Sequence, residues 1–126
     1  MSKKIISTPN APAAIGPYSQ AILAGNTLYC SGQIALNPAT GELVMDSIEA
    51  ETHQVMSNVK AVLAAADMDL TNAVKCSIFM SSMDYYGAIN TVYAEYFTEN
   101  PPAREAVAVK TLPKGVNVEI SVTAVK

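Results

Sequence analysis

The spacing of apolar residues changes along the chain, and in its first third the spacing is typical of short strands. Apolar positions there come in brief runs between turn-forming residues. The turn at 24–26 contains glycine and asparagine, which tolerate positive φ and favour a hairpin. The predicted elements are an edge strand at 5–7, strands at 20–23 and 27–33, and turns at 24–26 and 37–41.

From Ile48 the apolar period becomes that of a long amphipathic helix. Asp46 with Glu49 three residues later resembles a capping box, which predicts the start of this helix. Its buried face is predicted from positions at offsets 0, 4, 7, 8, 11, 14, 15 and 18, which are Ile48, Thr52, Val55, Met56, Val59, Val62, Leu63 and Ala66.

The second half of the chain predicts one more helix between strands. Ser82 is a candidate cap for this helix, and Pro101 marks the point by which it must end. One stripe of the helix carries Tyr86, Ile89, Tyr93, Tyr96 and Phe97. The strands are predicted at 74–80, 106–109 and 116–125, with a turn at 112–115 between the last two.

This order of elements predicts an α+β fold, a mixed sheet of about six strands with two helices on one face. A chain of 126 residues can bury one core, so residues 1–126 are expected to form a single domain. Half of the residues are apolar and only 15% are charged. Because the sheet face without helices would remain bare, we expect it to be buried between copies of the chain.

Charge and hydropathy narrow the classes of partner. The formal net charge is −3, and the longest basic run is Lys3-Lys4, so no nucleic-acid partner is expected. No segment approaches the roughly 18 apolar residues of a membrane span, and residues 1–7 lack a signal-peptide core. The chain is therefore expected to be cytoplasmic, without a membrane partner.

Residues that could bind a metal are few and scattered. Cys30 and Cys76 fit neither a zinc spacing nor a disulfide framework, and both are interpreted as buried thiols. His53 is the single histidine, and its position predicts a solvated residue on the polar side of the first helix. We therefore expect neither a metal site nor a cofactor.

The strongest candidate for chemistry is Arg104, the single arginine, which follows two prolines at the start of a strand-like segment. A guanidinium binds a carboxylate or phosphate through two parallel hydrogen bonds, which lysine cannot do. Ala106 and Ala108 share its face and leave room for a ligand. Glu119 lies on the polar face of the last strand and could orient a water if the two strands were neighbours. The alternative is that Arg104 and Glu119 pair with each other or with solvent.

Two other residues are candidates for the same site. Asn90 lies on or beside the apolar stripe of the second helix, where a buried amide needs partners. It could satisfy a strand end or point at a ligand. Tyr18 lies on a turn with glycine and proline, where it could face a pocket or cover the core.

The order and spacing of five segments resemble the Rid (YjgF) family of reactive intermediate deaminases over nearly the full length. The segments are Gly16-Pro17-Tyr18-Ser19-Gln20-Ala21, Tyr29-Cys30-Ser31-Gly32-Gln33, Ile89-Asn90-Thr91-Val92-Tyr93, Pro102-Ala103-Arg104 and Val118-Glu119-Ile120. The resemblance implies a chorismate-mutase-like fold and a homotrimer. In such a trimer the three sheets form a central barrel, and the sites lie in clefts between subunits.

The resemblance also implies an activity without cofactor or metal. The family hydrolyses 2-imino acids derived from 2-aminoacrylate and 2-aminocrotonate to 2-oxo acids and ammonia. By position, Arg104 would bind the substrate carboxylate and Glu119 would help to place the attacking water. The other residues implied to line the pocket are Tyr18, Ser31, Asn90 and Ala106.

Two positions depart from the family pattern. Glu105 stands where a small residue, often serine, is usual, and Ala106 stands where cysteine is common. Strand alternation predicts that Glu105 faces away from the ligand. At Ala106 the family contribution is largely a backbone N–H, which alanine retains, so deaminase activity is still expected.

Two alternatives remain. The trimer could be a non-catalytic module that binds a small 2-oxo or amino acid. The third reading, a ribonuclease or translation inhibitor as in older family labels, is the weakest, because the chain is acidic and has no basic stripe.

Overall fold

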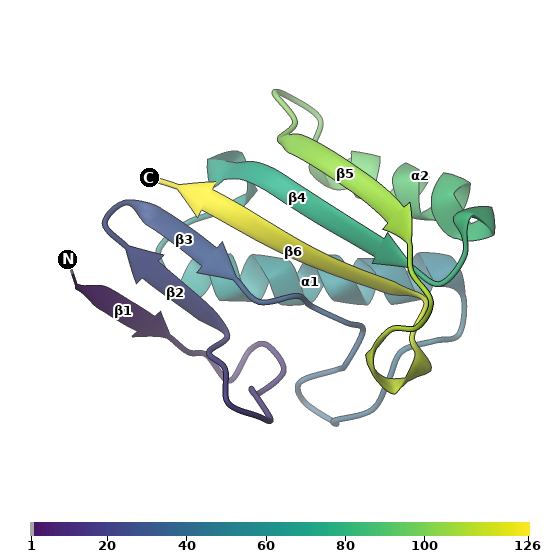
Figure 1. Ribbon diagram of the computed structural model, residues 1–126, viewed down its shortest axis with the longest axis horizontal. Helices are drawn as coiled ribbons and strands as arrows, with labels where there is room; N and C mark the ends of the chain where they lie inside the picture. The colour runs from purple at the N-terminus through teal and green to yellow at the C-terminus, as the bar shows by residue number, and fades with distance from the viewer. Residues whose placement is uncertain (1) are drawn as a thin grey trace.

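The computed structural model describes residues 2–126, and its strands form one six-stranded sheet in the order β1-β2-β3-β6-β4-β5 (Figure 1). The β4–β5 pair is parallel and every other neighbouring pair is antiparallel, so the sheet is mixed, as predicted. A parallel pair needs a crossover, which α2 supplies. The strands are β1 Lys3–Ile6, β2 Ala21–Ala24, β3 Thr27–Cys30, β4 Ala73–Met80, β5 Ala103–Ala108 and β6 Val118–Val125.

Two α-helices, α1 (Ile48–Ala65) and α2 (Tyr86–Tyr96), pack side by side on one face of the sheet (Figure 1). The α+β arrangement with both helices on one face is therefore confirmed. Three short 3₁₀ turns complete the described structure: η1 Leu70–Asn72, η2 Met83–Tyr85 and η3 Pro113–Gly115.

The helix starts differ from the sequence prediction. Ser47, not Asp46, caps α1, because Ser47 is the extended residue directly before the helix and its Oγ accepts from the N–H of Ala50 at 3.0 Å. Ser82 caps η2 through the N–H of Asp84, and α2 continues from that turn.

The predicted strand limits also change: β1, β2 and β4 are displaced by one or two residues at their ends, and the other three strands differ as follows. The strand expected at 27–33 ends at Cys30, and the chain rejoins the sheet at Gln33, which exchanges two backbone hydrogen bonds with Ile120 of β6. The strand expected at 106–109 begins at Ala103, because β4 offers a parallel partner from there on. Arg104 is therefore the second residue of β5. The last strand begins at Val118, not 116.

The core lies between the sheet and the two helices. The predicted alternation in β6 is confirmed, since Val118, Ile120, Val122 and Ala124 are buried against α1 while the residues between them are half-exposed. The opposite face of the sheet carries no helix (Figure 1). Large side chains on that face are exposed. Tyr29 is 55% exposed and Val107 is 42% exposed.

Buried polar side chains hold the loops against this core. Asn58 of α1 donates to the carbonyl oxygens of Ile34 and Leu36, at 2.9 Å each. Gln20 donates to the carbonyl oxygen of Pro12 at 2.8 Å and accepts from the N–H of Thr8 at 2.7 Å. Because loop backbone cannot pair within a sheet, these amides supply partners that the loops would otherwise lack.

Another buried polar residue, Glu51, is fully buried on α1 and binds the beginning of β6. Its Oε2 accepts from the N–H groups of Asn117 and Val118, at 2.8 and 3.3 Å, and its Oε1 accepts from Asn117 Nδ2 at 3.0 Å. Asn117 is also bound by Ser81, whose Oγ donates to Asn117 Oδ1 at 2.9 Å. One carboxylate thus fixes the entry of β6, two residues before Glu119.

Replacing Glu51 with alanine should lower the free energy of unfolding by about 3 kcal/mol, because it leaves two backbone donors without an acceptor in the interior. Urea denaturation at one fixed protein concentration measures this change. Glu49→Ala is the matched control: this exposed glutamate on the same helix should cost less than about 1 kcal/mol. Equal losses for the two variants would contradict the anchoring role of Glu51.

Candidate functional site

Arg104 lies on the helix side of the sheet and is held there by α2. It pairs in register with Cys76, which is fully buried. Its Nη1 donates to Asn90 Oδ1 at 2.8 Å and its Nη2 donates to the hydroxyl of Tyr86 at 2.9 Å. The guanidinium carbon lies 5.0 Å from the centroid of the Tyr93 ring. These contacts orient the guanidinium and leave further N–H donors for a ligand.

A hollow of about 320 Å³ opens beside this guanidinium. Tyr93 lines this hollow, and its hydroxyl is buried next to the Cys76 thiol. Burial raises the pKa of Tyr93, so the phenol keeps its proton and can donate. The hollow is lined by Asn90, Tyr93, Ala94, Phe97, Pro101, Pro102 and Arg104.

The two cysteines lie under this part of the sheet as thiols. Burial raises the pKa of Cys30 to about 12, and burial is also the main cause of the raised pKa of Cys76. Cys76 is fully buried, as predicted, whereas Cys30 is only half-buried. Neither is a thiolate nucleophile near neutral pH.

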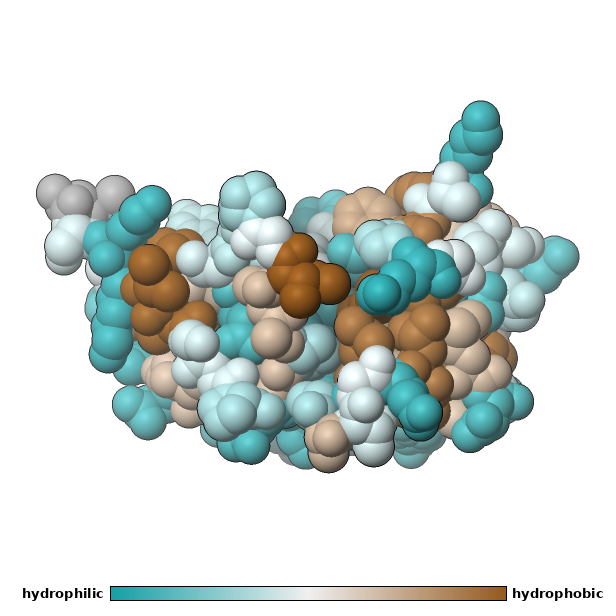
Figure 2. Space-filling model, turned by 90° about the horizontal axis from the view of Figure 1, so that it is seen from below, coloured by the Kyte–Doolittle hydropathy of each residue, from teal (hydrophilic) through white to brown (hydrophobic). Residues whose placement is uncertain are grey.

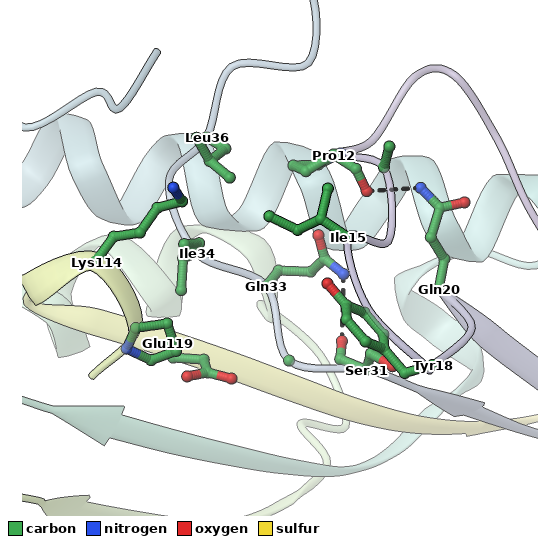
Figure 3. Close-up of a pocket in the computed structure, with 13 residues that line it drawn as sticks. Pro12, Ile15, Tyr18, Gln20, Ser31, Gln33, Ile34, Leu36, Lys114 and Glu119 are labelled. Atoms are coloured by element: carbon green, nitrogen blue, oxygen red, sulfur yellow. Dashed lines mark hydrogen bonds between the residues drawn. The ribbon is translucent and has the colours of Figure 1, made fainter. Parts of the chain in front are cut away.

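A larger cavity of about 470 Å³ contains three more candidate residues, Tyr18, Ser31 and Glu119 (Figure 3). Tyr18 lies on the loop before β2 and is 53% exposed, so it borders the cavity and does not cover the core. Ser31 follows β3, and its Oγ donates to the carbonyl oxygen of Ser19 at 2.6 Å. Gln33 Nε2 donates to the carbonyl oxygen of Ser31 at 3.2 Å and fixes the loop. The lining is Pro12, Ala13, Ile15, Tyr18, Gln20, Ser31, Gly32, Gln33, Ile34, Leu36, Pro113, Lys114 and Glu119.

Glu119 is the carboxylate of this cavity, and it lies against the backbone of Gly32. A Cβ at position 32 would lie 2.9 Å from Glu119 Cδ and would overlap Oε2, so any larger residue there would require the Glu119 carboxylate to move. Burial raises the pKa of Glu119 above its ordinary value. A half-buried carboxylate with a raised pKa is suited to accept a proton near neutral pH.

The strands of Arg104 and Glu119 are not neighbours, so the condition for a shared site within one copy is not met. Strand β4 separates β5 from β6, because the crossover through α2 places β5 at the edge. Glu119 pairs with Phe79, on the face opposite to Arg104 and Cys76. One copy of the chain therefore carries the candidate residues in two separate groups. The alternative that Arg104 and Glu119 pair with each other is wrong, because Arg104 binds Asn90 and Tyr86.

Glu105 faces away from Arg104, as strand alternation predicted. Its carboxylate is 2.7 Å from Lys75 Nζ and accepts a hydrogen bond from Ser77 Oγ, on the sheet face without helices. The Lys75 ammonium and the Ser77 hydroxyl hold the pKa of Glu105 below its ordinary value. Ala106 shares the face of Arg104, and its backbone contribution to a ligand stays a prediction.

His53 differs from the prediction of a solvated residue. Its Nδ1 is 2.7 Å from the hydroxyl of Tyr96, and the ring is half-buried between α1 and α2. Within residues 2–126, no three His, Cys, Asp or Glu side chains gather as metal ligands. Among residues 2–126, neither α1 nor α2 is both long enough and apolar enough to span a membrane.

The sequence-based prediction missed residues that lie beside the candidate residues in both groups. Tyr86 and Tyr93 were interpreted as core positions, although Tyr86, Asn90 and Tyr93 fall at offsets 0, 4 and 7, which places them on one helix face towards Arg104. Gly32 and Lys114 gave no signal, because their role depends on contacts made after folding.

Comparison with known proteins identifies the class of protein. Residues 8–126 match the Endoribonuclease L-PSP family. The chain is 49% identical over 124 residues to a RutC family protein of Pyrococcus horikoshii, with 98% of each chain covered. It is 46% identical over 124 residues to the 2-iminobutanoate/2-iminopropanoate deaminase of Capra hircus, covering 98% of this chain and 90% of the relative.

Solved structures agree with the sequence comparison. A putative endoribonuclease from Thermotoga maritima is 48% identical, with a TM-score of 0.96 and coverage of 98% of this chain and 97% of that one. The E. coli protein TdcF with bound serine is 37% identical, with a TM-score of 0.93 and coverage of 98% of each chain. The chain therefore belongs to the Endoribonuclease L-PSP family, which is the YjgF/Rid family, and the resemblance and fold type expected from sequence are confirmed.

Replacing Gly32 with alanine should displace the Glu119 carboxylate towards water, because the new methyl group occupies its place. The pKa of Glu119 should then fall towards the ordinary value of about 4.3 for glutamate. Carboxyl-carbon NMR titration with labelled glutamate measures this. Gly87→Ala is the control, since a Cβ there meets nothing within 4 Å, and an unchanged pKa in Gly32→Ala would contradict the contact.

Proposed function

We propose that this protein is a cytosolic 2-iminobutanoate/2-iminopropanoate deaminase, which hydrolyses 2-imino acids to 2-oxo acids and ammonia. The observation that carries the proposal is Arg104, the single arginine, oriented by Asn90 and Tyr86 with no carboxylate partner in residues 2–126. Such a guanidinium is ready to bind the carboxylate of a 2-imino acid. The goat relative bearing this enzyme name supports the same reading.

The active assembly in this proposal is a homotrimer with its sites between subunits. Arg104 and Asn90 of one copy would meet Tyr18, Ser31 and Glu119 of the next, which joins the two groups of residues. The uncovered sheet face would form the central barrel. Figure 2 shows hydrophobic surface between hydrophilic residues when the molecule is seen from the lower edge of Figure 1. Burial between copies of exposed apolar residues such as Tyr29 and Val107 would favour assembly.

The chemistry needs little beyond positioning. Arg104 would hold the substrate carboxylate, and Glu119 would take a proton from a water as its oxygen attacks the imine carbon. The protonated Glu119 would then return this proton to the nitrogen. As the tetrahedral intermediate collapses, Glu119 would carry its hydroxyl proton to the leaving nitrogen, so that the C–N bond breaks and ammonia and the 2-oxo acid are released.

A second candidate function is a binding module that captures a small amino or 2-oxo acid without turnover. The serine bound in TdcF, a relative in the same family, favours this candidate. Ligand binding without accelerated imine loss would distinguish it from the deaminase. A nucleic-acid substrate does not fit a chain with a net charge of −3 and one arginine.

Arg104→Ala should lower kcat/KM for 2-iminobutanoate by about 100-fold or more, because a bidentate charged contact is lost. Arg104→Lys should lose at least about tenfold, since an ammonium cannot form the two parallel bonds. The imine is generated by a threonine dehydratase, and its loss is measured by competition with semicarbazide. Glu105→Ser is the control and should stay within about twofold, because Glu105 faces away from Arg104. Wild-type turnover that survives in Arg104→Ala would overturn the proposal.

The pH dependence of kcat/KM should reflect the protonation of the Glu119 carboxylate. Its folded pKa is raised by burial, so the carboxylate that acts as base is lost as pH falls through a value above about 4.3. Enzyme-dependent kcat/KM, after subtraction of the uncatalysed rate, should therefore decline on that acid side. Glu119→Gln should lower the plateau about 100-fold and abolish this acid limb. An acid limb that persists in Glu119→Gln would assign the titration to another group.

A further inference from the structure

The cavity that contains Glu119 extends well beyond the groups that would act on an imine. It adjoins a second hollow of about 280 Å³, and five residues border both: Pro12, Ala13, Ile15, Leu36 and Lys114. Cavities of several hundred cubic ångströms hold ligands larger than a four-carbon imino acid. The site therefore has room for a substrate tail along Ile15 and Leu36.

Charge is unevenly distributed along this extended cavity. Among the residues that line the two hollows, Glu119 and Lys114 carry the charges, and only Lys114 borders both. Its ammonium has no ion-pair partner in the described part of the chain, and Figure 3 shows the side chain directed away from Glu119. An apolar tail would desolvate this ammonium without compensation, whereas an anionic tail would pair with it.

The backbone at Lys114 provides an independent observation. Lys114 has φ 57° and ψ 17°, in the left-handed region that long side chains seldom adopt. The other non-glycine residues with positive φ are Asp67 and Asn100, whose residue types tolerate that region. Residues kept in such a conformation cluster at ligand-binding sites. Here the conformation places a cation at the junction of the two hollows.

We propose that Lys114 is a specificity-determining residue that binds the distal carboxylate of a dicarboxylic 2-imino acid, such as the imine of glutamate. The inference rests on the proposed function, because it assumes that the 2-imino acid head lies beside Glu119. Ile15 and Leu36 contact the methylene chain, and Lys114 pairs with the second carboxylate. Hydrolysis follows the steps given for the smaller imines: water adds to the imine carbon, the C–N bond of the resulting adduct breaks, and ammonia and 2-oxoglutarate are released.

Binding of the products tests the proposal without requiring turnover. Isothermal titration calorimetry at low salt compares 2-oxoglutarate with 2-oxobutanoate on the wild type. We expect 2-oxoglutarate to bind about fivefold more tightly, the magnitude of a partly exposed ion pair. Added salt should reduce this preference. Equal affinity for the two products in the wild type would overturn the proposal.

Variants assign the preference to one side chain. Lys114→Met keeps the aliphatic stem and should abolish the preference for 2-oxoglutarate, while Lys114→Arg should retain it. Lys110→Met removes the same charge from an exposed lysine outside both hollows and should retain the preference. If Lys114→Met keeps the preference, or if Lys110→Met loses it equally, the charge at position 114 is not the determinant.

Hydrolysis measurements separate this inference from the proposed function. The imines of glutamate and methionine are generated by amino-acid oxidases with catalase present, and their loss is followed beside that of 2-iminobutanoate. In Lys114→Met, the ratio of kcat/KM for 2-iminoglutarate to that for the methionine imine should fall about fivefold. An unchanged ratio overturns the inference alone. If the wild type accelerates none of the three, the deaminase proposal fails, and the calorimetric comparison still decides the role of Lys114.

Discussion

The structure depends on one buried carboxylate. Glu51 of α1 binds the two N–H groups that open β6, and β6 is the central strand between β3 and β4. A buried charge is costly unless hydrogen bonds satisfy it, so this contact admits only one placement of the helix against the strand. The placement sets the register of Val118 and Ile120 in the core and directs Glu119 to the other face. The side chains of Gln20 and Asn58 bind loop carbonyl oxygens in a similar way, so that the larger cavity is formed mainly by irregular loops.

The architecture was predictable because it follows from periodic patterns. The 3.6-residue period from Ile48 and the alternation from Val116 were sufficient to place a helix and a strand, and the order of elements indicated the fold class. Element ends were less predictable, since they depend on partners distant in sequence. Strand β5 begins at Ala103 because β4 lies beside it, and β3 ends at Cys30 because the chain turns away to form the cavity wall.

The candidate site, like the fold, was predictable only where it depends on local sequence. Arg104, Asn90, Tyr18, Ser31 and Glu119 were identified from residue type and family resemblance, and the structure distributes them over two separate groups. Sequence could not show this separation, because the strand order depends on the crossover through α2 and not on local pattern. The position of Glu105 was predictable, since alternation within one strand is local. The roles of Gly32 and Lys114 were not predictable. Gly32 is important because it contacts the Glu119 carboxylate in the folded chain, and Lys114 because its backbone is left-handed.

The separation of Arg104 and Glu119 by the thickness of the sheet has a genetic consequence. In the proposed trimer each cleft takes its carboxylate-binding group from one copy and its base from the next, so no copy owns a complete site. A subunit without Arg104 and a subunit without Glu119 would each be inactive alone, yet a mixed ring would contain one cleft with both groups intact. Two defective alleles could therefore complement each other within one assembly, and the severity of either would depend on its neighbour in the ring.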